Sequence, residues 1–204
     1  MITVIDYGLG NVQAFANVFK RLDIPVNVAK SLDDLSETTK IILPGVGSFD
    51  RAMQQFNSCG MRKLIEQMVL EEGTPILGVC VGMQMLANSS EEGKLSGLGW
   101  VDGYVKKFDG TSMLQTQNLP HMGWNNVLAK AEGDLFKGIN EENKFYFLHS
   151  FHFDCCNESN IIGVTDYGFN FTSAIKKKNI FGVQFHPEKS HHYGAQLLKN
   201  YSEI

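Results

Sequence analysis

The sequence feature that most constrains the fold is the alternation of short apolar runs with segments of helical periodicity over roughly the first hundred residues. The run "ITVIDYG" ends in turn residues, and the segment after it places Phe15, Phe19 and Leu22 at helical spacing. This pattern predicts a strand followed by a helix. Repeated units of that kind fold into a mostly parallel sheet with helices on its faces.

The same alternation continues toward the middle of the chain. We expect further strands at "IPVNVAK", "KIILPG" and "TPILGVC", with Ser31 capping a short helix after the first of them. A helical stretch through Met61 and Met68 should stop at Gly73, because glycine favours helix ends. The segment "GMQMLAN" reads as the helix that follows "TPILGVC".

The second half of the sequence has a different pattern. From about Gly97 the chain reads mostly as strands joined by short turns, with a final amphipathic helix over "YGAQLLKNY". At 204 residues and 43% hydrophobic content, the chain fits one domain, 1–204, better than two. We therefore predict a three-layer, flavodoxin-like α/β fold whose mixed, mostly parallel sheet carries an antiparallel extension.

The net charge and the start of the sequence argue against several classes of function. A formal net charge of −4 gives no general attraction to nucleic acid or anionic lipid. The run Lys176-Lys177-Lys178 lies between two predicted strands and is interpreted as a solvated hairpin turn. The sequence "MITVIDYGLG" shows neither a signal peptide nor a membrane span, so we expect a cytoplasmic protein with no nucleic-acid or membrane partner.

The cysteines and histidines form no recognisable cofactor or metal motif. The four cysteines match neither a disulfide framework nor a paired metal motif, so reduced thiols are expected. His191 and His192 have no evident partner ligands and are predicted to lie at the surface, while His149 and His152 should serve packing or hydrogen bonding. "GLGNVQ" lacks the third glycine of a dinucleotide fingerprint. We expect no metal and no cofactor.

Cys80 is the first candidate for catalysis. It stands in Gly78-Val79-Cys80-Val81-Gly82, between a predicted strand and a predicted helix. Small residues on both sides of a nucleophile allow a sharp turn that lifts the reactive atom clear of the sheet, and the helix that follows directs its positive end at the sulfur. The alternative is a packed cysteine in a glycine-rich turn.

Two further segments support a catalytic reading. In "FGVQFHPEKS", His186 and Glu188 are two residues apart, so on a strand they would face the same way as a base and its orienting carboxylate. In "LPGVGSF", the loop 45–47 follows a buried strand and should reach the same sheet edge as Cys80, where it can donate N–H groups. An exposed histidine and a plain tight turn are the alternatives.

Taken together, G-V-C-V-G-M-Q, H-P-E and P-G-V-G resemble the class I (triad) glutamine amidotransferases over most of the chain. "YGLGN", "LPGVGSF", "HMGWN", "FLHSF" and "QFHPEKS" are similar to the glutaminase subunits of imidazole glycerol phosphate synthase, an enzyme of histidine biosynthesis. The elbow carries Val81 where leucine is usual, and "FHFDCCNESN" is an unusual connection. Neither difference touches Cys80, His186 or Glu188.

The resemblance implies that Cys80 attacks the side-chain amide of glutamine, that His186 transfers protons and that Glu188 orients His186. Ammonia leaves, and glutamate is released from a thioester. The remaining site residues implied by the resemblance are oxyanion and substrate contacts: Gly45, Val46, Gly47, Val81, Gln84, Ser150 and Phe151. The oxyanion loop is expected to rearrange when the partner is loaded, which would gate activity.

The resemblance also implies a heterodimer. Its partner would be a TIM-barrel cyclase that receives the ammonia and forms imidazole glycerol phosphate and aminoimidazole carboxamide ribotide. The implied contact residues are Asn11, Trp124, Tyr146 and Lys189. For a tryptophan or tyrosine in a strand, a place in the core is the alternative.

Three other functions remain open from the sequence. A related glutaminase could serve a surface-sugar amidotransferase beside a different synthase. A non-catalytic interaction subunit could keep the fold, although Cys80, His186 and Glu188 are all retained. A hydrolase or peptidase could share the cysteine elbow, and a screen of glutamine against peptides would separate it from an amidotransferase.

Overall fold

The parallel half of the main sheet is built from the predicted strand–helix units. The computed structural model describes residues 1–108, 118–130 and 134–204. The parallel strands, in spatial order, are β2 (Val26–Ala29), β1 (Ile2–Ile5), β3 (Lys40–Gly45), β4 (Ile76–Cys80) and β13 (Ile180–Val183). Strands β1, β4 and β13 are buried along their whole length, as expected for strands covered on both faces.

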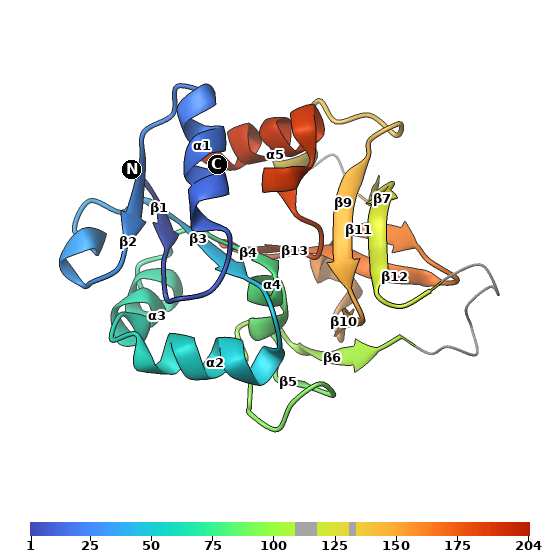
Figure 1. Cartoon of the computed structure of the whole chain (residues 1–204), viewed down its shortest axis with the longest axis horizontal. Coiled ribbons are helices and arrows are strands. Elements are labelled where there is room, and N and C mark those ends of the chain that lie inside the picture. Colours follow the sequence, from blue (N-terminus) through green and yellow to red (C-terminus); the bar gives the residue numbers. More distant parts are fainter. Residues whose placement is uncertain (109–117, 131–133) are drawn as a thin grey trace.

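Helices cover both faces of this parallel half (Figure 1). The helices are α1 (Val12–Arg21), α2 (Phe49–Ser58), α3 (Arg62–Leu70), α4 (Val81–Met85) and α5 (His191–Glu203). The order β2-β1-β3-β4 means that the chain moves in one direction through α1 and in the other through α2 and α3. Because such crossovers are right-handed, α1 lies with α5 on one face and α2 and α3 lie on the opposite face.

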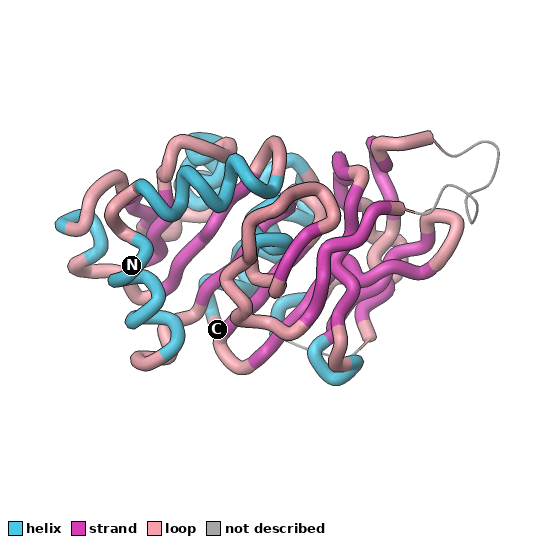
Figure 2. The backbone as a smooth tube through the Cα atoms, turned by 90° about the horizontal axis from the view of Figure 1, so that it is seen from below, coloured by secondary structure: helices cyan, strands magenta, loops and turns pink. Residues whose placement is uncertain are grey.

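An antiparallel extension continues the sheet beyond β13, as predicted, and Figure 2 shows the strands gathered at that end of the molecule. Its strands are β12 (Asn170–Lys177), β11 (Ile161–Asp166), β10 (Phe151–Cys155), β8 (Leu128–Ala129), β6 (Gly103–Lys107) and β5 (Ser89–Ser90). β5 pairs with β6 in parallel, and the other pairs are antiparallel. Of the lysine run, Lys176 and Lys177 end β12 and pair with β13, and only Lys178, at φ 55°, lies in the β12–β13 turn.

Two strands leave the main sheet and form a separate antiparallel pair. β7 (His121–Asn125) pairs with β9 (Phe145–His149), and His121 lies opposite His149. Side chains alternate across this pair, so Met122, Trp124 and Leu148 are exposed while Phe145 and Phe147 are buried. We expected these segments to belong to one extended sheet, but they form a separate pair with an apolar outer face.

Two local predictions differ from the structure. Ser31 does not cap a helix: a 3₁₀ turn at Asp33–Leu35 follows it, and the Asp34 carboxylate accepts from the backbone N–H groups of Lys30 and Ser31. The acidic side chain is already ionised and accepts more strongly than a serine hydroxyl. Helix α2 was not identified from the sequence. Its residues Phe49, Ala52 and Phe56 nevertheless form a buried stripe at helical spacing.

Candidate active site

Cys80 sits at the strained junction between β4 and α4. Its backbone has φ 56° and ψ −113°, values that a non-glycine residue rarely adopts. It is the last residue of β4 and the N-cap of α4, as the sequence predicted. Backbone strain of this kind persists only where surrounding packing enforces it, and it is typical of nucleophile elbows.

The glycines around Cys80 allow close approach of backbone. A Cβ atom at Gly82 would lie 2.0 Å from the Leu43 carbonyl oxygen, and one at Gly78 would lie 2.6 Å from the Gly82 carbonyl oxygen. A Cβ at Gly45 would lie 2.3 Å from the Gly82 nitrogen. These three glycines therefore bring β3, β4 and the start of α4 into contact and hold the elbow in its strained conformation.

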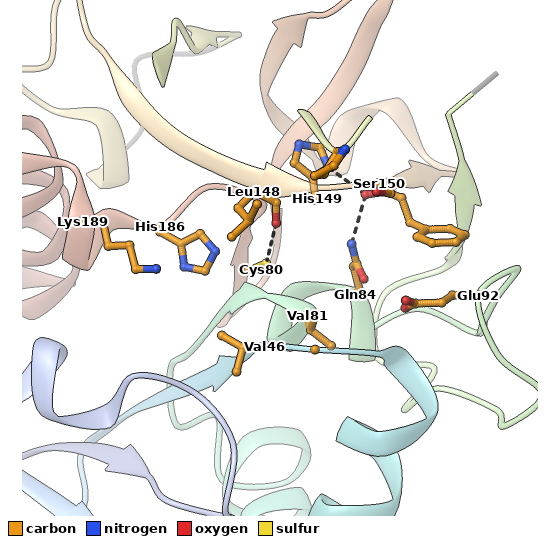
Figure 3. A pocket seen from close by; sticks show the side chains of 13 residues that line it. Val46, Cys80, Val81, Gln84, Glu92, Leu148, His149, Ser150, His186 and Lys189 are labelled. Atoms are coloured by element: carbon orange, nitrogen blue, oxygen red, sulfur yellow. Dashed lines mark hydrogen bonds between the residues drawn. The ribbon is translucent and has the colours of Figure 1, made fainter. Parts of the chain in front are cut away.

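A pocket of about 270 Å³ opens over Cys80 at the carboxyl edge of the parallel strands (Figure 3). Nine residues predicted from the sequence line it: Val46, Gly47, Cys80, Val81, Gln84, Ser150, Phe151, His186 and Lys189. Four lining residues were not predicted as site residues: Glu92, Pro120, Leu148 and His149. The tertiary structure thus gathers six separate segments of the chain around one sulfur atom.

His186 and Glu188 form a buried pair beside the pocket. The His186 Nδ1 lies 2.9 Å from the Glu188 Oε1, and the two side chains are 3% and 2% exposed. The pair is not on a strand, contrary to our expectation: β13 ends at Val183, and Pro187–Lys189 form a 3₁₀ turn. The proline fixes this turn, so the carboxylate reaches its histidine by folding back rather than by strand alternation.

Backbone hydrogen bonds hold the His186 turn in place. The His186 N–H donates to the Tyr146 carbonyl at 2.8 Å, and the Ser190 hydroxyl donates to the His186 carbonyl at 2.6 Å. The Tyr146 N–H in turn donates to the Ser190 hydroxyl oxygen at 3.0 Å. These bonds tie the turn to strand β9, so the imidazole that faces the pocket is fixed from two sides.

The environment of His186 favours its protonated form. Burial by itself lowers the pKa of this histidine, but hydrogen bonding to the Cys80 thiol and the Glu188 carboxylate outweighs burial and raises the pKa to about 10. The electrostatic interaction of His186 with both groups acts in the same direction. With Nδ1 bound to Glu188, the other ring nitrogen is the one available to the sulfur.

The Cys80 sulfur has two polar contacts besides His186. It lies 3.9 Å from the Leu148 carbonyl oxygen and 3.8 Å from the Gln184 amide nitrogen. Gln184 is completely buried, and its side-chain oxygen accepts from Gln84 at 3.0 Å. A line of polar side chains therefore runs from the sulfur to Gln84 in the pocket wall.

The loop 45–47 reaches the sheet edge next to Cys80, as predicted: Gly45 pairs with Cys80 in the register of β3 and β4. Val46 is 37% exposed, and Gly47 has φ +86°. Val46 and Gly47 line the pocket together with Val81, whereas Gly45 does not line it and packs against Gly82. Gly45 is thus a packing residue in this conformation of the loop.

Gln84, Ser150 and Phe151 form the opposite wall. The Gln84 amide donates to the Phe151 carbonyl at 3.1 Å, and the Ser150 carbonyl accepts from the Phe108 N–H at 3.3 Å. Glu92 stands beside them, and one of its carboxylate oxygens accepts from the Phe49 N–H at 2.8 Å. Glu92 has no motif around it, so nothing in the sequence could have indicated it.

The four predicted partner-contact residues all reach the surface. Trp124 is 46% exposed and stacks on His191 with ring centroids 4.9 Å apart. Tyr146 lies opposite Trp124 on β9, and the Lys189 ammonium lies 5.7 Å from the Tyr146 ring centre. Asn11 is exposed and caps α1 at the same edge of the sheet. The core alternative for Trp124 is wrong.

The histidines considered for a metal site are distributed as predicted. His191 and His192 are exposed, whereas His149 on β9 and His152 on β10 are buried. Among the described residues, no group of three or more histidine, cysteine, aspartate or glutamate side chains is arranged to hold a metal ion. None of the helices in the described part of the chain is long and apolar enough to cross a bilayer.

Comparison with known proteins gives the class first. Residues 3–202 match the family "Glutamine amidotransferase class-I", and the chain belongs to this family. Among solved structures, PurLQS from Thermotoga maritima superposes with a TM-score of 0.74 at 17% identity, covering 99% of this chain and 97% of that one. A structure described as a glutamine amidotransferase gives a TM-score of 0.73 at 16% identity, with the same coverage. Both likenesses show the fold.

Curated relatives give the particular subunit. A protein of Bdellovibrio bacteriovorus is 55% identical and one of Leptospira interrogans is 47% identical, each over the full length of both chains. A protein of Methanococcus maripaludis is 42% identical over 98% of each chain. All three are named as the HisH subunit of imidazole glycerol phosphate synthase, the third as HisH 2. Within the class, the chain belongs with the HisH subunits.

Proposed function

We propose that this chain acts as the glutaminase of imidazole glycerol phosphate synthase in histidine biosynthesis, and that Cys80, His186 and Glu188 are its catalytic triad. The observation that carries the proposal is the strained elbow of Cys80 in one pocket with His186, which is itself held by Glu188. The names of the full-length relatives support this pathway over surface-sugar amidation.

In the first half-reaction, the Cys80 thiolate attacks the side-chain carbonyl carbon of glutamine. The carbonyl oxygen becomes an oxyanion, which the Val81 N–H and an N–H group of loop 45–47 stabilise. The carbon–nitrogen bond then breaks, and His186 gives its proton to the leaving nitrogen. A pKa of about 10 means that His186 holds this proton at neutral pH. Ammonia leaves, and a glutamyl thioester remains on Cys80.

In the second half-reaction, water attacks the thioester. His186 accepts a proton from the water, the carbon–sulfur bond breaks, and glutamate leaves while the thiolate is restored. Glu188 keeps the His186 ring in one orientation through both steps, because its carboxylate holds Nδ1 at 2.9 Å. Both side chains are buried, so bulk water does not compete for this hydrogen bond.

The opposite wall of the pocket suits the amino-acid end of glutamine. Gln84 and the backbone of Ser150 and Phe151 provide polar groups there, as the family resemblance implies. We add Glu92 to them, because glutamine carries an α-ammonium group and Glu92 is the carboxylate that lines this side of the pocket. Cys80 and Glu92 would then hold the two ends of the substrate.

The ammonia is passed to a partner subunit, which we propose to be a TIM-barrel cyclase in a heterodimer. Ammonia that escaped into water would be protonated and lose its nucleophilicity. The exposed residues Met122, Trp124 and Leu148 supply an apolar face next to the pocket, with Lys189 at its border. Such a face suits a lasting protein contact.

The experiment that tests the function measures glutamate release from glutamine by the purified chain. It is run alone, with the cyclase subunit of the same cell, and with that subunit plus its nucleotide substrate. A large increase with both additions is expected if loop 45–47 rearranges in the loaded complex. No increase, with Cys80 still reactive toward a glutamine-analogue label, would contradict the histidine-pathway assignment.

A further inference from the structure

A pair of buried histidines connects the two-stranded sheet to the wall of the pocket. His121 on β7 and His149 on β9 lie directly opposite one another, and the His121 Nδ1 is 3.0 Å from the His149 Nε2. The His149 Nδ1 is 2.8 Å from the Phe151 carbonyl oxygen. At the other end, the Asn125 amide nitrogen lies 3.3 Å from the His121 Nε2.

The chemistry of the end groups fixes the direction of this chain. A carbonyl oxygen only accepts, so the His149 Nδ1 must carry the hydrogen. In a neutral ring the His149 Nε2 is then an acceptor, and the His121 Nδ1 must donate to it. The His121 Nε2 becomes an acceptor in its turn, and it faces an amide N–H₂ group of Asn125. Each hydrogen bond therefore fixes the tautomer of a histidine ring, and that tautomer is the one that the next hydrogen bond needs.

Burial keeps the rings of His121 and His149 neutral, as the hydrogen-bond chain requires. Loss of solvation lowers the pKa of His149 to about 3, against a smaller opposing effect of its bond to Phe151, and lowers the pKa of His121 to about 4. The neighbouring His152 and His186 act in the same direction on His149. A second proton on either ring would place two donors face to face.

The hydrogen-bond chain ends at the Phe151 carbonyl, which belongs to the pocket wall. The Phe151 carbonyl accepts from His149 on one side and from Gln84 on the other. Gln84 is itself held by Gln184, whose amide nitrogen lies 3.8 Å from the Cys80 sulfur. The position of the backbone at Phe151 is thus set relative to the nucleophile from two directions.

We propose that His121 and His149 are positioning residues for glutamine, which hold the pocket wall at 150–151 through a hydrogen-bond chain of fixed direction. The inference rests on the proposed function, because that wall is where the amino-acid end of the substrate binds. His149 lines the pocket, but the ring nitrogens of both histidines are engaged in this hydrogen-bond chain. Their loss should therefore weaken substrate binding more than it slows the chemical step.

His152 provides the matched comparison. It lies on β10 next to Phe151, is buried, and packs with its ring centre 4.9 Å from that of Phe108. Its Nδ1 finds no hydrogen-bond partner in the described part of the chain, and it does not line the pocket. The variant His152→Phe therefore replaces a buried histidine of β10. It leaves in place the hydrogen bonds that connect Asn125, His121, His149 and Phe151.

The kinetic test uses the complex with the partner subunit and its nucleotide substrate. For His149→Phe we expect the KM for glutamine to rise about tenfold or more, with kcat within about threefold, because the Phe151 carbonyl loses one donor. His149→Asn keeps an N–H near the Nδ1 position and should recover most of the affinity. His152→Phe should leave both constants unchanged. Equal constants for His149→Phe and His152→Phe would overturn the inference.

A spectroscopic test does not depend on activity or on any variant. Nitrogen NMR of the full chain labelled at histidine should show both His121 and His149 as neutral Nδ1–H tautomers, with no titration between about pH 5.5 and 8. An Nε2–H tautomer at either ring would overturn the inference. Failure of the unaltered complex to hydrolyse glutamine would instead overturn the proposed function and leave the NMR result standing.

Discussion

The proposed mechanism uses three residues, and each depends on its neighbours for its properties. Cys80 has an unfavourable backbone conformation, His186 has a pKa raised to about 10, and the Glu188 side chain is almost completely buried. A cysteine, a histidine and a glutamate in ordinary surroundings would share none of these features. Substitutions at these positions therefore test single steps of the mechanism.

Replacement of the nucleophile should abolish turnover without loss of the fold. For Cys80→Ala we expect glutamate release to fall to background, because no thioester can form. Binding to the partner subunit, followed by titration calorimetry, should stay within about twofold of the unaltered chain. Substantial glutaminase activity in this variant would remove Cys80 from the mechanism.

Replacement of the orienting carboxylate should affect rate and pH dependence together. In Glu188→Gln, we expect kcat to fall by about a hundredfold or more, because the ring of His186 is no longer held in one tautomer. The pKa of His186 should also fall, since Glu188 is one of the groups that raise it. The pH–rate profile of the complex measures both effects. An unchanged profile would show that Glu188 is only a packing residue.

At the scale of elements, the site depends on close contact between β3, β4 and α4. The contact distances at Gly45, Gly78 and Gly82 leave no room for a methyl group. The pocket wall depends in the same way on the pairing of β7 with β9, which brings the two buried histidines together. These contacts lead to two predictions about the free energy of unfolding.

A methyl group at Gly82 should open the contact between β3 and α4. We expect Gly82→Ala to lower the free energy of unfolding by about 3 kcal/mol, because its Cβ would lie 2.0 Å from a backbone oxygen that cannot move away. Gly73→Ala is the control: its Cβ meets nothing within 4 Å, and only its φ of +75° opposes it, at about 1 kcal/mol. Urea unfolding measures both. Equal losses would contradict the packing argument.

The buried histidine pair should make the fold sensitive to mild acid. The pKa values of His121 and His149 are lowered to about 4 and about 3 in the folded chain, so between pH 6.5 and these values the unfolded chain binds more protons. The free energy of unfolding should therefore fall as the pH drops below about 6.5, by up to about 1.4 kcal/mol per pH unit for each histidine. The contribution of these two histidines should be constant above that pH.

The double variant His121→Phe with His149→Phe is the comparison for this acid effect. It keeps the aromatic packing of His121 against Phe147 but has nothing to protonate at either position. Its free energy of unfolding, measured with urea between pH 7.5 and 5, should vary less with pH than that of the unaltered chain. An equal slope in both proteins would show that other groups cause the acid sensitivity.

At the scale of the whole molecule, the pocket and the apolar face of β7 and β9 are parts of one surface. Leu148 belongs to both, since it is exposed on the face and lines the pocket. A partner that covers this face would also cover the mouth of the pocket. That arrangement allows ammonia to leave toward the partner and away from solvent.

Removal of the exposed tryptophan should weaken the complex specifically. We expect Trp124→Ala to reduce the affinity for the proposed partner subunit by about tenfold or more, because a large exposed aromatic side chain is a typical interaction hot spot. Tyr104→Ala is the matched control, since Tyr104 is 45% exposed but lies on β6. Calorimetric titration of each variant with the partner subunit measures the two affinities. Equal affinities would place the partner on another face.

The sequence by itself determined the strands and most of the helices of the parallel half and the motif around Cys80, because periodicity and glycine spacing are local properties. The residues of the proposed triad were also predicted from motifs, although the strand expected at His186 and Glu188 is a proline-fixed turn. Helix α2 was missed although its buried residues have helical spacing. The roles of Glu92 and His149 were missed because their neighbours in the pocket lie far away along the chain.

Only the tertiary structure decided how these segments combine into a pocket. It placed Cys80, the turn of His186 and the wall at Ser150 around one cavity, and it set His121 against His149 across two strands. It also turned Trp124 outward, where a strand pattern alone left core and surface equally open. The physical reason is the same throughout: hydrogen-bond partners, burial and pKa shifts arise from contacts between distant segments, which no local pattern encodes.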